Sequence, residues 1–209
     1  MRYTPRRDCQ IPCLADLYEK YLPERDRRFV EVGASDGATV SNTVFLAEAG
    51  WFGLYIEPNP EAAKLCAENH KNRRGIIIEQ TAISDYAGEA DLFLIGDCST
   101  LVWDKSAVDW GGDPNRKVTV TVTTLDRLLT RLHWKPGFEL LVIDVENSEL
   151  RVLGGFTIQH WQPAVVVIET HELDPAPERN AKAKPIQIWF ERNGYRKVYT
   201  DHINSVFIR

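Results

Sequence analysis

The sequence predicts an α/β fold built on an open, mainly parallel seven-stranded sheet, with helices on both faces and an antiparallel end strand. Short apolar runs of strand length alternate with amphipathic segments of helical spacing, and parallel strands require such crossover helices. Two runs, Leu140–Ile143 and Ala164–Ile168, are apolar at every position, which is typical of strands covered on both faces. A last pair of apolar runs near the C-terminus predicts a hairpin that supplies the antiparallel strand.

The composition is that of a soluble globular protein with a single domain over residues 1–209. Hydrophobic residues make up 44% of the chain and charged residues 26%, and this length is enough for one core. No apolar run approaches the ~20 residues that span a bilayer. The first residues, Met1–Arg7, are followed by no apolar stretch that could act as a signal peptide. We therefore expect a cytoplasmic protein without a membrane span.

The charge distribution argues against a general nucleic-acid binder. The formal net charge is −5, whereas proteins that bind nucleic acids usually carry a basic surface. The amino-terminal segment is locally basic, with Arg2, Arg6, Arg7, Arg25, Arg27 and Arg28. We interpret these arginines as a solvated surface, with a phosphate-binding patch as the alternative.

The cysteines show no metal-binding pattern. Cys9, Cys13, Cys66 and Cys98 form no Cys-x-x-Cys pair and have no histidine at zinc-ligand spacing. We expect reduced thiols with a structural role.

Glycine and proline mark the ends of the elements in the first half of the chain. The segment from Leu14 to Leu22 carries apolar residues at helical spacing and stops before Pro23, so a short helix is expected within a cover segment over residues 1–27. Asn59 and Pro60 predict the cap and first turn of a later helix, with Ala62, Leu65, Cys66 and Asn69 following at helical spacing. Strands are expected over Phe29–Val32, Trp51–Ile56 and Gly75–Ile78, and another helix over Ser41–Ala49.

The second half adds half-exposed strands and a long irregular segment. Asp91–Ile95 and Val118–Thr123 alternate with period two, which predicts strands with one exposed face. Residues 96–117 lack periodicity, and a loop of this length is often functional, so a substrate loop is expected there. Trp103 and Trp110 in this loop either form an apolar wall for a substrate or hold the loop to the core. Helices are expected at Leu125–Leu129, Leu150–Leu153 and Ile186–Arg192, and the hairpin at Lys197–Tyr199 and Ser205–Ile208.

A glycine loop follows the first strand. Residues 29–37 read Phe-Val-Glu-Val-Gly-Ala-Ser-Asp-Gly, and Gly33 and Gly37 can take positive φ and let a ligand approach the backbone. In open α/β sheets a nucleotide-like ligand binds at this strand end, and an acidic residue ending the next strand accepts hydrogen bonds from ribose hydroxyls. Glu57 is in that position. Ser35 takes the place of the second glycine of a dinucleotide fingerprint, so a nicotinamide-dependent oxidoreductase is the less favoured alternative.

Several stretches together resemble the FkbM family of S-adenosylmethionine (SAM)-dependent methyltransferases. The resemblance covers residues 29–169 and rests on the following stretches: Glu31-x-Gly33-x-x-x-Gly37 with Ser41–Thr43, Gly50–Leu54 leading to Ile56–Pro58, Thr124–Asp126, and Ile143–Glu146 with Glu149, Val152, Leu153 and Gly154. It implies a Rossmann-like class I methyltransferase fold, SAM as cofactor with S-adenosylhomocysteine as product, and methylation of a hydroxyl oxygen on a small molecule or glycan. Asn147 stands where the family has glycine. Asparagine tolerates the left-handed region, but its side chain faces any ligand there, which leaves the substrate open.

The resemblance also implies the residues that hold the cofactor. They are Glu31, Gly33, Ala34, Ser35, Asp36, Gly37, Glu57, Thr81, Ala82 and Asp144. Thr81 and Ala82 are expected beside the adenine ring, with an ordinary strand end as the equal alternative. A SAM-binding module without catalytic activity is a further alternative for the whole chain.

The expected catalytic groups follow two apolar strands. Asp144 and Glu146 lie two apart after one strand, and Glu169 and His171 lie two apart after another, so neighbouring strands would bring them together. The catalytic residues predicted are Asp144, Glu146 and His171. Either one group acts as general base, with Asp144 or Glu146 preferred to His171, or the carboxylates hold a divalent cation. We favour the metal-free base. The alternative is that Glu146 and Glu149 cap a helix while His171 lies in solvent.

Overall fold

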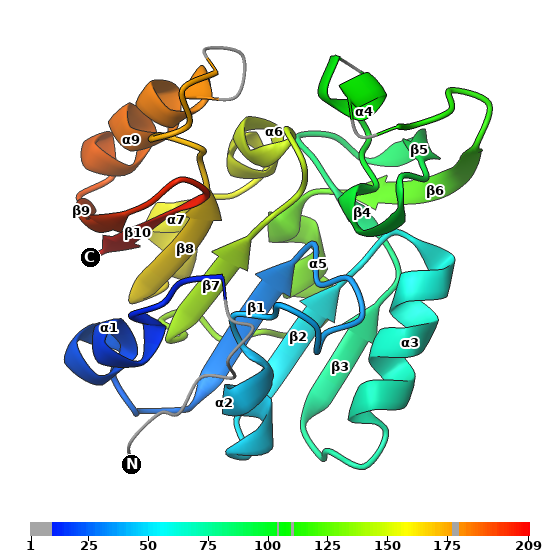
Figure 1. Cartoon of the computed structure of the whole chain (residues 1–209). Coiled ribbons are helices and arrows are strands. Elements are labelled where there is room, and N and C mark those ends of the chain that lie inside the picture. The colour runs from blue at the N-terminus through cyan, green and yellow to red at the C-terminus, as the bar shows by residue number, and fades with distance from the viewer. Residues whose placement is uncertain (1–9, 104, 110, 177–179) are drawn as a thin grey trace.

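A seven-stranded sheet forms the centre of the computed structural model, which describes residues 10–103, 105–109, 111–176 and 180–209 (Figure 1). Its strands, in the order β3-β2-β1-β7-β8-β10-β9, are β3 (Ile76–Glu79), β2 (Phe52–Ile56), β1 (Arg28–Val32), β7 (Leu140–Ile143), β8 (Val165–Glu169), β10 (Asn204–Ile208) and β9 (Arg196–Thr200). The first five are parallel to one another, and β10 is antiparallel to both of its neighbours. The predicted fold class is confirmed, and the antiparallel strand lies one place in from the edge.

The register of the central strands explains their composition. Val30 of β1 pairs with Leu54 of β2 and Leu141 of β7, and all three residues are fully buried. Along β7, Leu140 and Val142 belong to one core, whereas Leu141 and Ile143 belong to the other. Both faces of the strand are covered, which is why every position is apolar.

Helices cover the sheet on both faces, as predicted (Figure 1). One core holds residues of α1 (Leu14–Tyr21), α2 (Val44–Glu48) and α3 (Pro60–His70). The opposite core holds residues of α5 (Leu125–Arg131), α6 (Glu149–Gly154), α7 (Ile158–Trp161) and α9 (Ala183–Arg192). The described part of the chain is therefore a three-layer sandwich of helices, sheet and helices.

A small second sheet lies beyond the carboxyl ends of β2 and β3 (Figure 1). It pairs β6 (Lys117–Thr123) with β4 (Ala82–Ile83) on one side and β5 (Gly88–Phe93) on the other. The half-exposed strands expected near residues 91 and 118 are thus β5 and β6. The expected substrate loop at residues 96–117 contains a 3₁₀ turn, η1 (Gly96–Cys98), and a short helix, α4 (Lys105–Asp109).

Some local expectations were wrong. The helix expected from Ser41 begins at Val44, because the Ser41 hydroxyl accepts hydrogen bonds from the Thr43 and Val44 amides and forms a turn there. In α3 the buried positions are Ala63, Cys66 and His70, whereas Leu65 is 57% exposed. The short helix α7 was not predicted.

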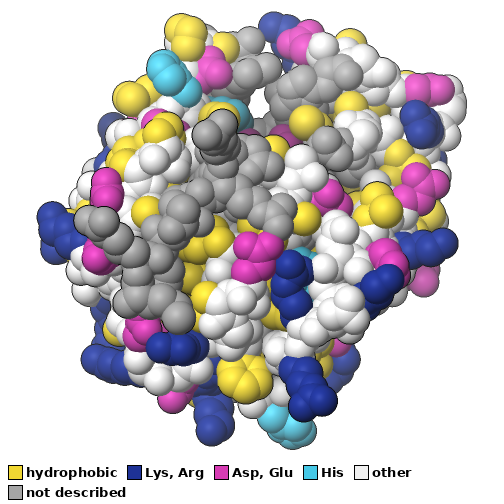
Figure 2. All heavy atoms as spheres, turned by 60° about the horizontal axis from the view of Figure 1, so that its bottom comes forward, with side chains coloured by type: hydrophobic (Ala, Val, Ile, Leu, Met, Phe, Trp, Pro, Cys, Tyr) yellow, Lys and Arg dark blue, Asp and Glu magenta, His cyan; other side chains and the backbone are white. Residues whose placement is uncertain are grey.

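The remaining expectations concern charge, thiols and membrane. Arg27 and Arg28 pair with Glu24 and Asp26. On the face in Figure 2, basic side chains are interspersed with acidic ones.

Cys13, Cys66 and Cys98 are in no disulfide. No helix among the described residues has the length and apolar character needed to cross a bilayer. Arg2, Arg6, Arg7, Cys9 and Trp110 lie outside the described residues.

Candidate active site

A cavity of about 300 Å³ opens at the carboxyl ends of β1, β2 and β7. This is the size of a small-molecule site and the usual place for one in an open α/β sheet. Its lining includes nearly all of the predicted cofactor residues: Glu31, Gly33, Ala34, Ser35, Asp36, Glu57, Thr81, Ala82 and Asp144. Of the predicted set, Gly37 is not part of the lining.

The glycine loop is shaped by the strand beside it. Gly33 has φ of +83°, and a Cβ there would lie 1.6 Å from the carbonyl oxygen of Asp144. We expected this glycine to admit a ligand, but the group that requires it is the backbone at the end of β7. The side chain of a larger residue at position 33 would therefore collide with the end of β7 and displace the loop, whether or not a ligand is bound.

Ser35 and Glu57 join the loop to the end of β2. Ser35 has φ of +48°, in the left-handed region, and its amide donates to Glu57 Oε2 at 2.8 Å. The other carboxylate oxygen accepts from the Asn59 amide at 2.8 Å. Burial raises the pKa of Glu57, and these two hydrogen bonds oppose the rise. Each oxygen keeps acceptor capacity, so the carboxylate can still bind a diol in the cavity.

Asp36 and Gly37 have structural partners. The Asp36 carboxylate accepts hydrogen bonds from the Ala38 amide and from the amide and hydroxyl of Thr39, so it stabilises the turn that follows the loop. A Cβ on Gly37 would lie 2.5 Å from Cys66 Sγ and 2.9 Å from His70 Nε2. Gly37 therefore allows α3 to approach the loop closely.

Glu31 lies at the back of the cavity and is 4% exposed. It accepts from Thr43 Oγ1 at 2.5 Å and from Ser41 Oγ at 3.2 Å. Burial raises its pKa to about 7, although these hydrogen bonds favour the ionised form. The Ser41–Thr43 stretch thus fixes this carboxyl group.

Thr81 and Ala82 line the cavity as expected, but the Thr81 hydroxyl donates to the Thr121 carbonyl at 3.0 Å. Its side chain therefore ties the loop to the small sheet. Ala82 belongs to β4 of that sheet.

One buried polar atom in the cavity wall lacks a partner. The Ser148 hydroxyl is buried without a hydrogen bond to any described residue, and Ser148 lines the cavity. A buried hydroxyl without a partner costs free energy, and a ligand could supply the missing bond. Together with the Glu57 carboxylate, this hydroxyl fits a polar cofactor in the cavity.

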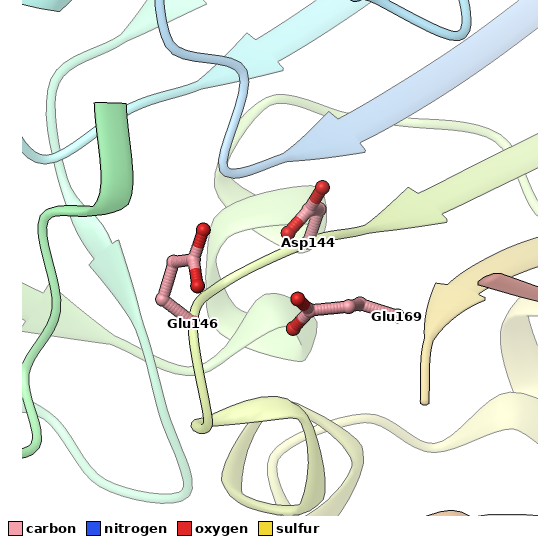
Figure 3. A group of neighbouring side chains, drawn as sticks. All are labelled: Asp144, Glu146 and Glu169. Carbon is pink, nitrogen blue, oxygen red and sulfur yellow. The ribbon is translucent and has the colours of Figure 1, made fainter. Parts of the chain in front are cut away.

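Three carboxylates converge beside the cavity, from the ends of β7 and β8. Asp144, Glu146 and Glu169 each have an oxygen within 4.8 Å of the others, and Figure 3 shows the three groups pointing toward one another. Burial, followed by the charge of Glu169, raises the pKa of Asp144 to about 7 and that of Glu146 to about 8. These two carboxyl groups are therefore able to exchange a proton near neutral pH.

The turn after Asp144 accounts for the unusual asparagine. Glu146 and Asn147 both take left-handed φ values, +51° and +72°. Asparagine tolerates this region better than most residues, so the turn does not require glycine. The Glu146 carbonyl accepts a hydrogen bond from Thr100 Oγ1 at 2.7 Å, which ties the segment of residues 96–117 to the acidic cluster.

That segment also forms part of the cavity wall, through Gly96, Cys98, Ser99 and Leu101. Trp103 packs on Phe93 of β5, with ring centroids 5.0 Å apart. Of the two roles considered for Trp103, this contact favours holding the segment to the small sheet.

His171 lies behind Glu169 and does not line the cavity. Its Nε2 donates to Glu169 Oε1 at 2.6 Å, and its Nδ1 donates to the His202 carbonyl at 3.1 Å. The hydrogen bond to Glu169 raises the pKa of His171. Both nitrogens are thus engaged, and the imidazole is placed to orient Glu169 rather than to reach an acceptor.

Sequence reasoning missed Gln10 and Lys182, which contact the cluster of Asp144, Glu146 and Glu169. The Gln10 amide nitrogen donates to Asp144 Oδ2 at 3.3 Å, and its oxygen accepts from Asn204 Nδ2 at 3.1 Å. Lys182 contacts Glu169 and Glu149. Neither residue belongs to a periodic pattern, so no local signal marked them.

Comparisons with known proteins place the chain among methyltransferases. A family model described as the methyltransferase FkbM domain matches residues 31–197. A precorrin-6y C5,15-methyltransferase from Geobacter metallireducens GS-15 has a similar structure, with a TM-score of 0.52 and 12% identity, over 99% of this chain and 92% of that one.

Two further structures are similar at lower scores. The O-methyltransferase TomG from Streptomyces achromogenes, in complex with SAM, gives a TM-score of 0.49 and 13% identity over 87% of this chain and 72% of that one. A ribosomal protein L11 methylase from Lactobacillus delbrueckii subsp. bulgaricus gives a TM-score of 0.49 and 12% identity over 94% of this chain and 77% of that one. No curated protein matches the chain.

Proposed function

Because the chain belongs to the FkbM methyltransferase family and SAM is its cofactor, we propose that it methylates a hydroxyl oxygen of a sugar or another small molecule. The observation that carries this proposal is the position of Asp144 and Glu146 beside the cavity, with pKa values near neutrality. A hydroxyl becomes a good nucleophile only when a base takes its proton. The most effective base has a pKa near the working pH.

The residues of the cavity suit the cofactor. Glu57 would hold the ribose hydroxyls, the glycine loop would border the amino-acid part, and the unpartnered Ser148 hydroxyl offers a further hydrogen bond. When bound, SAM supplies an electrophilic methyl group. The chain itself has to orient the acceptor and remove its proton.

Asp144 and Glu146 are the groups placed for proton removal. Of the predicted catalytic residues Asp144, Glu146 and His171, the first two line the cavity and His171 does not, which supports Asp144 or Glu146 as the base. Asp144 or Glu146 accepts the proton of the acceptor hydroxyl. His171 and Glu169 hold the cluster in place from the side away from the cavity.

A divalent cation at the same cluster is the second candidate. The oxygens of Asp144, Glu146 and Glu169 lie within 4.8 Å of one another, and hard cations prefer carboxylate ligands. A bound cation would acidify the acceptor hydroxyl directly. The proposal of a metal-free base and this alternative predict different responses to chelation.

The test is turnover of Asp144→Asn and Glu146→Gln, with and without EDTA, on a panel of hydroxylated sugars and small metabolites. A general base predicts that kcat falls by ~10²–10⁴ in the variant that lacks it, with SAM affinity kept and no effect of EDTA. Activity lost in EDTA and restored by Mg²⁺ would assign the cluster to a metal. Binding of SAM without turnover of any acceptor would favour a module without catalytic activity.

A further inference from the structure

A lysine with little exposure to solvent lies against the acidic cluster of Asp144, Glu146 and Glu169. Lys182 immediately precedes α9, and its side chain is 10% exposed. Its Nζ lies 2.6 Å from Glu169 Oε2 and 2.8 Å from Glu149 Oε2. The ammonium therefore joins the end of β8 to the first turn of α6 and the start of α9.

The charge of Lys182 also reaches the two carboxyl groups that line the cavity. It favours the ionised forms of Asp144 and Glu146, against burial and against the charge of Glu169. Burial alone would lower the pKa of Lys182, but Glu149 and Glu169 outweigh it and raise that pKa. The lysine thus keeps its positive charge inside the cluster.

Burial and the charge of Glu169 raise the pKa of Asp144, Glu146 and Glu149. A positive charge near these four carboxyl groups therefore favours their ionised forms, because like charges in a poorly solvated site repel strongly. Proteins often supply it with a divalent cation, which oxygen ligands of this kind bind well. Here a side chain of the protein already contacts two of the four carboxylates. His171 contacts Glu169 on its other oxygen, so both oxygens of Glu169 have cationic partners.

We propose that Lys182 is the internal counter-ion of the acidic cluster, in the role that a divalent cation has in comparable carboxylate sites. It acts as a positioning residue: it fixes Glu169 and Glu149 and leaves Asp144 and Glu146 facing the cavity. The role of Asp144 and Glu146 in proton removal is taken from the proposed function, and this proposal for Lys182 depends on the proposed function in that respect only. The charge compensation itself is independent of the reaction.

An ordinary salt bridge that only fastens α9 to the core is the competing explanation. Removing Lys182 would lower stability in both cases, so stability alone does not separate them. Affinity for a divalent cation separates the two explanations, because only a counter-ion role predicts that loss of the ammonium creates a cation site. Mn²⁺ is the probe, because its binding can be followed by electron paramagnetic resonance without turnover.

The experiment compares Mn²⁺ affinity and the thermal midpoint of wild type, Lys182→Met, Lys182→Arg and Lys184→Met. Lys184 lies two residues later, in the first turn of α9, and is exposed, which makes it the matched control. Lys182→Met is expected to bind Mn²⁺ with a Kd at least ~10-fold lower than that of wild type. Mn²⁺ should raise its thermal midpoint, as any ligand of the native state does. Lys182→Arg and Lys184→Met should behave as wild type.

Two outcomes would overturn the proposal. If wild type binds Mn²⁺ and Glu169→Gln abolishes that binding, the cluster is a native metal site. A folded Lys182→Met with wild-type Mn²⁺ affinity would reduce Lys182 to a structural ion pair. If Lys182→Met does not fold, Lys182→Met combined with Glu149→Gln removes one buried carboxyl group together with the ammonium and carries the same prediction. None of these measurements uses an acceptor, so failure of the proposed O-methylation would show separately, as SAM binding without turnover of any hydroxyl acceptor.

Discussion

The carboxyl groups of Asp144 and Glu146 titrate in a range where ordinary carboxyl groups are already ionised. Burial and the neighbouring charge of Glu169 raise their pKa values to about 7 and about 8. The base form is fully present only above both values.

This titration predicts the pH dependence of turnover. Since the base has to be deprotonated, kcat should rise with pH between about 6 and 9 and fall as the cluster takes up protons below that range. Glu146→Gln removes one charge from the cluster, so in any activity that remains the rise should move to lower pH. A pH profile of kcat at saturating SAM and acceptor measures both effects. A profile that is flat over this range would exclude both carboxyl groups as the base.

Glu57 is expected to have two roles, one in the fold and one in SAM binding, and its replacement should show both. The carboxylate holds the Ser35 and Asn59 amides and is expected to accept the ribose hydroxyls of SAM. Glu57→Ala should weaken SAM binding by ~2–3 kcal/mol, the cost of losing hydrogen bonds to a charged group, and should also lower the thermal midpoint. Calorimetric titration with SAM measures the first effect.

Glu61→Ala is the control for Glu57→Ala, because Glu61 is an exposed carboxylate in the first turn of the next helix. It should keep wild-type affinity. A Kd for SAM within twofold of wild type in a folded Glu57→Ala would remove Glu57 from the cofactor site.

The sequence could reveal some site residues and not others, for a physical reason. Glu57 and Asp144 directly follow apolar strands, and the carboxyl ends of parallel strands meet at one edge of the sheet, so their neighbourhood could be predicted. Gln10 and Lys182 reach the same place from irregular segments far along the chain. Their partners are set by tertiary packing, which leaves no local pattern in the sequence.

At the scale of elements, helix α3 holds the glycine loop from one side. Asn69 Nδ2 donates to the Asp36 carbonyl at 2.9 Å, and His70 Nε2 donates to the Gly37 carbonyl at 2.8 Å. The Arg73 guanidinium donates to His70 Nδ1 at 3.1 Å, which requires a neutral imidazole. The end of α3 therefore fixes two consecutive carbonyl groups of the loop.

His70 should make stability depend on pH. Burial, followed by the charge of Arg73, lowers its pKa below the ordinary value of 6.5, although the Gly37 carbonyl, Glu48 and Asp36 oppose the shift. The unfolded chain thus binds this proton more readily than the folded chain, and the free energy of unfolding should fall as pH falls below about 6.5. The buried carboxyl groups with raised pKa values act in the opposite direction, so the comparison needs a variant.

His70→Gln keeps a donor for Gly37 and removes the titration. Urea unfolding at a series of pH values measures the free energy of unfolding of both proteins. As the pH falls below about 6.5, wild type should lose stability relative to His70→Gln. Parallel curves for the two proteins would mean that His70 does not contribute in this way.

Element length decided which parts of the fold could be predicted. Runs such as Leu140–Ile143 are buried on both faces, and their composition alone identifies them as strands. β4 has two residues and α7 has four, which is too short for a period of 2.0 or 3.6 to show. β5 and β6 were predicted as strands, but alternation indicates only an exposed face and does not say which sheet contains them.

At the scale of the whole molecule, the cavity is where separate parts of the chain meet. Its wall combines the glycine loop, the end of β2, the start of the small sheet and the turn after β7. These segments are distant in sequence and come together only in the folded state. A ligand that fills the cavity should therefore bind the native protein and have no comparable site on the unfolded chain.

This selectivity predicts a large thermal shift with the cofactor. A ligand present at about 100 times its Kd adds roughly 2.7 kcal/mol to the free energy of unfolding. For a chain of this size each kcal/mol corresponds to about 2–4 °C, so SAM and S-adenosylhomocysteine should each raise the thermal midpoint by roughly 5–10 °C. NAD should give no comparable shift, because Ser35 has a Cβ where a dinucleotide fingerprint has glycine. Differential scanning fluorimetry with the three ligands, and with Glu57→Ala as the variant that should lose the shift, makes the comparison. A shift with NAD equal to that with SAM would show that the cavity selects no more than an adenosine group.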